Sequence, residues 1–195
     1  MTKRIFDFTA ALVGLLLLSP LFLLVGIWIK LDSPGPVFFR QQRVGKDGVM
    51  FNIVKFRTIV DEAQENLLTL QHDRRITQVG RFLRRHKLDE FPQLFNVIAG
   101  TMSLVGPRPE VARYVDCYPP EVRSVVLSVA PGITDWASIY YKEEGSLLSR
   151  SSNPEAAYLE NILPTKLKYN MRYVQERSFW NDVRIILSTL AALVR

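Results

Sequence analysis

The chain has 195 residues, 48% of them hydrophobic, and carries a formal net charge of +6. This length suits one compact domain, and the positive charge favours an anionic partner: nucleic acid, an acidic membrane surface or a phosphorylated substrate. A single cysteine, Cys117, excludes an intramolecular disulfide, and together with only two histidines it argues against a zinc site.

An uncharged apolar run covers residues 8–29. A helix of this length, at about 1.5 Å per residue, spans roughly 33 Å and can cross a bilayer. A cleaved signal peptide is the weaker alternative, because the run is long and no small-residue cleavage site follows it. The segment is apolar on every face, which also argues against a helix in a soluble core.

Ser19 and Pro20 interrupt this segment near its middle. Pro20 has no N–H and its ring presses on the carbonyl of Leu16, while the Ser19 hydroxyl can satisfy a freed backbone group. Basic residues flank both ends of the segment, which favours a cytoplasmic position for both: Lys3, Arg4, Lys30, Arg40, Arg43 and Lys46. These features leave two interpretations open, a kinked spanning helix and a re-entrant hairpin.

Beyond residue 30 the pattern predicts a mixed α/β fold, mostly helical with short strands. Turn-forming residues occupy positions 32–36 and 45–48, and the second turn suits a hairpin between strands at 37–39 and 50–54. We expect helices over 61–71, 76–88, 155–172 and 179–194, with Pro164 ending the third or beginning a new helix. The helix at 76–88 has a basic face suited to lipid headgroups or phosphate, although a solvated surface has the same appearance.

Asp89 and Glu90 are adjacent acids that follow the basic helix. One carboxylate can attack phosphorus as a nucleophile while the other holds Mg²⁺ or accepts a proton. Taken alone, such a pair is more often a charged feature at a helix end than a catalytic centre.

The turn at residues 106–110 places Arg108 between two prolines, which fix the backbone around a guanidinium suited to phosphate. Lys55 and Arg57 add two cations after a strand. We take Lys55, Arg57, Pro107, Arg108 and Glu110 as candidate substrate- and phosphate-binding residues.

These features occur together in a recognisable order, and the chain resembles the bacterial sugar transferases, small monotopic phosphoglycosyl transferases, over nearly its whole length. The resemblance rests on Lys3-Arg4 with Asp7, the Ser19-Pro20 break, and the motifs at residues 35–39, 42–45, 55–58, 76–84, 88–94, 102–110 and 131–134. It departs from the family pattern in the C-terminal third, where Asp135 stands at a position commonly occupied by glycine and Asn170 replaces a common acid. These departures leave the phosphoryl-transfer residues unchanged.

The resemblance implies an enzyme that moves a sugar-1-phosphate from a UDP-sugar to a polyprenyl phosphate such as undecaprenyl phosphate, and releases UMP. Asp89 would form the covalent phosphosugar intermediate, Glu90 would assist, and both would contact Mg²⁺. The product would be the first membrane-bound intermediate of a surface glycan, passed on to downstream glycosyltransferases.

The resemblance also implies an organisation. Residues 1–30 would be a re-entrant membrane segment broken at Ser19-Pro20, in contact with membrane lipids. Residues 31–195 would form a catalytic domain with interfacial helices on the cytoplasmic face of the bacterial inner membrane. A non-catalytic membrane-anchored module is the main alternative, and nucleic-acid binding is set aside because the basic residues serve a membrane-tethered, phosphate-directed site.

Overall fold

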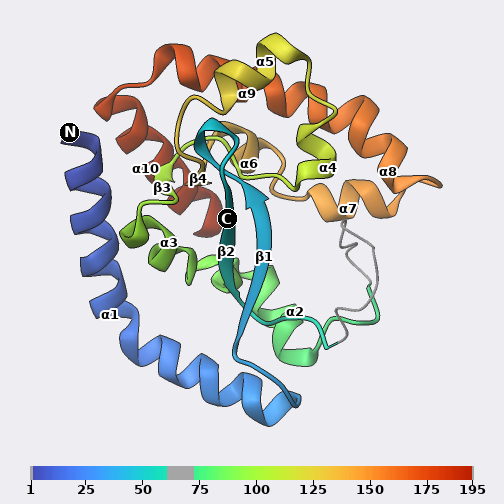
Figure 1. Cartoon of the computed structure of the whole chain (residues 1–195). Coiled ribbons are helices and arrows are strands. Elements are labelled where there is room, and N and C mark those ends of the chain that lie inside the picture. Colours follow the sequence, from blue (N-terminus) through green and yellow to red (C-terminus); the bar gives the residue numbers. More distant parts are fainter. Residues whose placement is uncertain (1, 61–72, 195) are drawn as a thin grey trace.

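The computed structural model of the chain describes residues 2–60 and 73–194. Helices predominate in this part and the strands are short, as the sequence predicted (Figure 1). The predicted helix at 61–71 lies outside the described residues.

The elements run in the following chain order. They are α1 (Thr2–Asp32), β1 (Phe38–Val44), η1 (Lys46–Gly48), β2 (Met50–Phe56), α2 (Gln78–Arg85), η2 (Leu88–Glu90), α3 (Gln93–Ala99), β3 (Ser103–Val105), α4 (Ala112–Val115), α5 (Pro120–Val126), β4 (Gly132–Thr134), α6 (Trp136–Tyr140), α7 (Glu144–Ser149), α8 (Pro154–Ala157), the π-helical η3 (Tyr158–Ile162), α9 (Leu163–Glu176) and α10 (Phe179–Val194).

The described strands form two small sheets of two strands each. β1 and β2 form the predicted antiparallel hairpin, longer than expected, with Phe38 opposite Phe56 at its open end. Asp47 adopts φ +55° at the tip, which allows the tight reversal. β3 and β4 pair in parallel, with Ser103 opposite Gly132, and so bring together two distant parts of the chain.

The apolar segment forms one long helix, α1, with a bend rather than the predicted break. Figure 1 shows α1 changing direction part-way along as it wraps around the outside of the body, while the helix continues through Pro20. The Ser19 hydroxyl donates a 2.8 Å hydrogen bond to the carbonyl of Leu16, the group that loses its helical partner to Pro20. Among the described residues, α1 alone is long and apolar enough to cross a membrane, and little of its most apolar stretch is buried.

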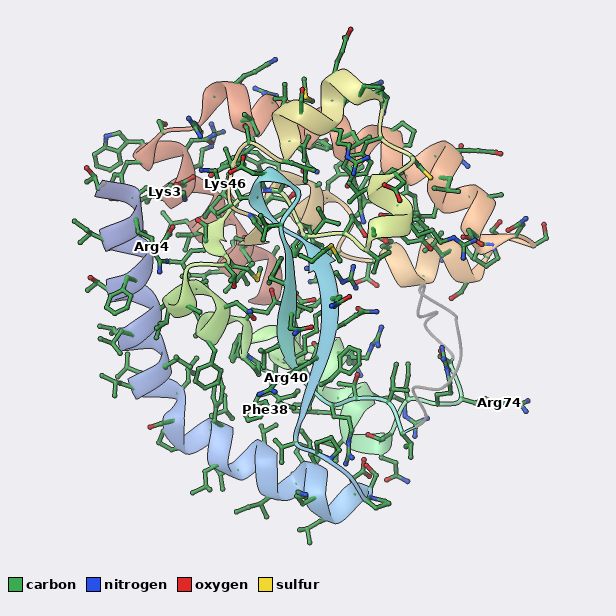
Figure 2. All side chains as sticks on the ribbon, in the orientation of Figure 1. Lys3, Arg4, Phe38, Arg40, Lys46 and Arg74 are labelled. Carbon is green, nitrogen blue, oxygen red and sulfur yellow. The ribbon has the colours of Figure 1, made fainter. Side chains whose placement is uncertain are left out.

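Both ends of α1 are attached to the same body. Near the N-terminal end, the Lys3 ammonium donates to Asp182 of α10 at 2.5 Å. At the C-terminal end, the Asp32 carboxylate accepts a 3.2 Å hydrogen bond from the Val79 amide of α2. Figure 2 places Lys3 and the hairpin-tip residue Lys46 in the same upper part of the view, away from the C-terminal part of α1.

Two of the predicted helices have different bounds in the structure. The helix expected at 76–88 is the shorter α2, because Thr77 caps its start and Lys87 turns the chain with φ +56°. The helix expected at 155–172 is instead the run α8, η3 and α9, and Pro164 lies in the first turn of α9, where proline is tolerated. The helix at 179–194 is α10, as predicted.

Candidate active site

The two adjacent acids lie on a short 3₁₀ turn, η2, between α2 and α3. The left-handed conformation of Lys87 ends α2 and starts this turn, and Leu88 anchors it by packing on an apolar cluster with α1 and α2. Successive side chains on a 3₁₀ turn diverge by about 120°. Asp89 and Glu90 therefore face different surroundings although they are neighbours in the chain.

Glu90 is the partner of two cations that come from distant parts of the sequence. Lys55 donates to its carboxylate at 3.1 Å, and both terminal nitrogens of Arg108 contact it, one at 3.0 Å. Burial raises the pKa of Glu90, but the charges of Arg108 and Lys55 and the Arg108 hydrogen bond outweigh it and hold the pKa well below its usual range. Glu90 is therefore ionised and fixes both cations in place.

Asp89 has a different environment. Asp89 is only 8% exposed. In the part of the chain that the structure describes, no group forms a hydrogen bond or ion pair with its carboxylate. Burial raises the pKa of Asp89, the charge of Glu90 raises it further, and the charge of Lys55 opposes the rise. A weakly partnered carboxylate with a raised pKa is a candidate reacting group.

An open cavity of about 1470 Å³ borders both acids. Its wall includes Lys55 and Arg108 and several cations of the α2 region, namely Arg81, Arg84, Arg85 and Lys87. The cavity exceeds the roughly 300–1,000 Å³ of common small-molecule pockets. It therefore has room for a large anionic ligand with Asp89 at its edge.

The turn at 106–110 is held by close backbone approach to β4. The Gly132 amide donates to the Pro107 carbonyl at 3.0 Å, and the Gly106 amide donates to the Thr134 carbonyl at 3.1 Å. A Cβ at Gly132 would meet the Gly106 nitrogen at 2.1 Å, so both glycines are needed for this contact. Pro107 takes part in this contact through its carbonyl, and the turn presents Arg108 to Glu90.

Glu110 belongs to a second charged cluster on the same cavity. Its carboxylate accepts a 2.6 Å hydrogen bond from the Tyr158 hydroxyl and lies 3.6 Å from Arg43 and 3.7 Å from Lys166. Lys166 also contacts Glu144 of α7 at 2.6 Å. Glu110 thus binds cations of the protein in this structure rather than lying beside Glu90.

Arg57, a predicted phosphate-binding residue, contacts the backbone of a neighbouring turn in the structure. Its guanidinium is buried and donates to the carbonyls of Ser33 and Pro34, at 2.7 and 2.6 Å, and to the Ser33 hydroxyl at 2.9 Å. These contacts join the end of β2 to the turn that leaves α1. The phosphate-binding role of Arg57 stays a prediction.

Several cavity residues did not emerge from the sequence. Arg43 lies in a motif that supported the family resemblance and could have been found there. Asp135 and Asn170 were noted only as departures from the family pattern. Glu144, Tyr158 and Lys166 come from helical elements whose packing no local pattern reveals.

Few side chains near the site could serve as ligands for Mg²⁺. No group of three or more histidine, cysteine or acidic side chains suited to a metal occurs among residues 2–60 and 73–194. Asp89 has no competing partner within the described part of the chain, whereas Glu90 already contacts Lys55 and Arg108. This set fits an ion held by one or two carboxylates together with ligand phosphates, a common arrangement for Mg²⁺.

Comparison with known proteins identifies the family. The model described as bacterial sugar transferase matches residues 1–195. The chain belongs to this family. The match covers the acid pair, both cationic partners of Glu90 and the whole of α1.

Curated relatives of this sugar transferase carry names that specify the reaction. UDP-glucose:undecaprenyl-phosphate glucose-1-phosphate transferase of Escherichia coli (strain K12) is 37% identical over 96% of this chain, which spans 39% of that relative. The enzyme of the same name from Caulobacter vibrioides is 35% identical over 98% of the chain and 69% of the relative. An N-acetylgalactosamine-phosphate transferase of Aeromonas hydrophila, named as using undecaprenyl phosphate, is 35% identical over 98% of the chain and 43% of the relative. The chain thus spans less than half the length of two of these three relatives.

Proposed function

We propose that the chain transfers a sugar-1-phosphate from a UDP-sugar to a polyprenyl phosphate such as undecaprenyl phosphate, and releases UMP. One observation carries this proposal: Asp89 is buried and unpartnered among the described residues at the edge of a large cavity, next to a carboxylate that fixes two cations. The family membership and the names of the relatives supply the substrate classes.

Asp89 is the nucleophile in this proposal. Its carboxylate oxygen attacks the phosphorus that bears the sugar, the bond from that phosphorus to the UMP oxygen breaks, and UMP leaves with the electron pair. An oxygen of the polyprenyl phosphate then attacks the same phosphorus and releases the Asp89 carboxylate. The product is a polyprenyl-diphosphate-linked sugar, the first membrane-bound intermediate of a surface glycan and a substrate for downstream glycosyltransferases.

Glu90 is a positioning residue in this mechanism. It holds Lys55 and Arg108 beside Asp89, where their charges stabilise the phosphate oxygens as negative charge moves toward UMP. A bound Mg²⁺ would offset diphosphate charge, with Asp89 and Glu90 as its protein ligands. Omission of Mg²⁺ from the UMP-release assay tests this proposed role of the metal.

We also propose that α1 is re-entrant and that the enzyme is monotopic on the cytoplasmic face of the bacterial inner membrane. The contacts of Lys3 with Asp182 and of Asp32 with Val79 support this, because they attach both ends of α1 to one body. A straight spanning helix would place one end across the bilayer and break one set of contacts. The Ser19 hydrogen bond makes the bend at Pro20 tolerable in lipid.

The Asp89→Asn substitution tests the proposed reaction. We expect UMP release from a UDP-sugar with polyprenyl phosphate and Mg²⁺ to fall by about a thousandfold or more, because an amide cannot form the acyl-phosphate. Folding and membrane association should persist, since the change removes a buried charge and keeps the shape.

Asp116→Asn is the matched control. Asp116 is an exposed acid whose contact is with Arg123, so its substitution should leave UMP release unchanged. Turnover by Asp89→Asn at the parental rate would refute the nucleophile assignment. A folded, membrane-bound parent that releases no UMP from any UDP-sugar would favour the non-catalytic module.

A further inference from the structure

One wall of the cavity contains buried polar atoms that find no partner in residues 2–60 and 73–194. The wall is built by α6 and α9, and Asp135, Ser138 and Asn170 all border the cavity. Asp135 Oδ2, Ser138 Oγ and Asn170 Oδ1 are covered from solvent and have no hydrogen-bond partner among the described residues. A buried polar atom left unpaired costs about 1–3 kcal/mol, so such atoms are few in native proteins and indicate a missing partner.

The three side chains come from two regions that pack together, the start of α6 and α9. The other oxygen of the Asp135 carboxylate accepts a 2.6 Å hydrogen bond from the Ser138 amide and so caps the N-terminus of α6. Lys166 and Asn170 are four residues apart on α9 and share one of its faces. Burial raises the pKa of Asp135, while neighbouring Ser138 and the charges of Arg108 and Lys166 oppose the rise. The wall borders the same cavity as the Arg108–Glu90 pair.

The chemistry of this wall differs from that of the α2 side. Figure 1 shows α2 and α9 toward opposite ends of the β1–β2 hairpin, and the arginines of α2 make its side cationic. The α6–α9 wall offers a carboxylate, an amide and a hydroxyl, and its cation Lys166 is paired with Glu144 and Glu110. Phosphates therefore suit the cationic side, and neutral hydroxyl groups suit the α6–α9 wall.

We propose that Asp135, Ser138 and Asn170 form the subsite that binds the hydroxyl groups of the transferred sugar, an inference that rests on the proposed function. A hexose presents several hydroxyls, and each can donate or accept, so it can satisfy all three side chains. Uracil offers one N–H donor and two carbonyl acceptors, and the carbonyls would meet a carboxylate. The broad χ2 torsions of Asp135 and Asn170 allow their oxygens to turn toward the cavity.

The test measures donor selectivity. In detergent-solubilised protein with polyprenyl phosphate and Mg²⁺, kcat/KM for UMP release is compared between the preferred UDP-hexose and UDP-sugars that lack or invert single hydroxyls. We expect Asp135→Asn, Ser138→Ala and Asn170→Ala each to reduce the preference by about tenfold for at least one hydroxyl position. Thermal stability without donor should be kept or raised in Ser138→Ala and Asn170→Ala, because each of these two changes removes an unpaired buried atom.

Two further readouts distinguish this subsite from other roles. Ser124→Ala, an exposed serine of α5, is the control and should leave every donor ratio unchanged. Inhibition by UMP should change less than twofold in the three variants, because UMP has no transferred sugar. Weaker UMP inhibition in proportion to the donor effect would assign the wall to the nucleoside and overturn the proposal.

Failure of the inference is separable from failure of the proposed function. A parent that turns over while all three variants keep its donor ratios would overturn the sugar subsite alone. A parent that releases UMP from no donor would overturn the proposed function and the subsite together.

Discussion

At the scale of single residues, Asp89 and Glu90 acquire different properties from their partners. Glu90 accepts hydrogen bonds from Lys55 and Arg108, and these cations hold its pKa low. Asp89 is buried beside the charge of Glu90 without such bonds among the described residues, and its pKa is raised. The same chemical group thus serves as a fixed counter-ion at one position and as a candidate nucleophile at the next.

The raised pKa of Asp89 predicts a pH dependence. The carboxylate must be ionised to attack, so kcat/KM should rise with pH through the pKa of Asp89, which lies above the ordinary value for aspartate. The charge of Lys55 favours the ionised form. Its removal in Lys55→Gln should therefore raise this pKa and move the acidic limb of the pH profile to higher pH.

Lys87→Gln is the comparison for this measurement. Lys87 also lowers the pKa of Asp89, but less than Lys55 does. The acidic limb of the Lys87→Gln pH profile should therefore move to higher pH by a smaller amount than that of Lys55→Gln. A limb that moves to lower pH in Lys55→Gln, or stays where it is, would contradict the assignment.

At the scale of elements, Arg57 joins the end of β2 to the turn after α1. Its guanidinium bonds with Ser33 and Pro34 and packs on Gly35, where an added Cβ would lie 1.9 Å from an Arg57 nitrogen. Gly35 has φ +123°, a conformation that side chains rarely adopt. The turn is thus shaped around the arginine.

Arg57→Met should destabilise the fold more than it affects donor binding. It leaves the two carbonyls and the Ser33 hydroxyl without their donor, which we expect to lower the free energy of unfolding by about 2 kcal/mol or more. Unfolding in detergent measures this change, and KM for the UDP-sugar should stay within about twofold. Arg150→Met, at an exposed arginine after α7, is the control. Normal stability with a raised KM would instead favour the phosphate-binding role.

At the scale of the whole molecule, the attachment of both ends of α1 determines the expected relation to the membrane. The body holds Lys3 through α10 and Asp32 through α2. Most of the helix surface between them is exposed, including Leu16, Leu17 and Leu24. An apolar helix with both ends on one body suits insertion from one face of a bilayer.

Cysteine labelling tests this topology. In a Cys117→Ser background, which removes the exposed native thiol, Thr2→Cys and Lys46→Cys should both react with a membrane-impermeant maleimide from the cytoplasmic face only. Labelling from opposite faces would contradict the re-entrant arrangement and support a spanning helix.

Much of the fold was accessible from local patterns. The apolar run, the β1–β2 hairpin and α10 have periodicity or turn signals that depend on neighbouring residues alone, and the structure contains all three. The helices α3 to α7 were not predicted, because each has seven or fewer residues and is too short for a clear period. The end of α2 was placed too late because the conformation of Lys87 is not visible in its residue type.

The sequence by itself determined the acid pair, the cationic candidates and the apolar segment interrupted by Ser19 and Pro20, since these depend on residue type and spacing. Only the tertiary structure decided which acid has partners: Glu90 meets cations 35 and 18 residues away, whereas Asp89 meets none among the described residues. It also placed Arg57 on the turn after α1 and assembled the α6–α9 wall. Pairings of this kind arise when the chain packs and long-range partners compete for each charged group, which local pattern does not encode.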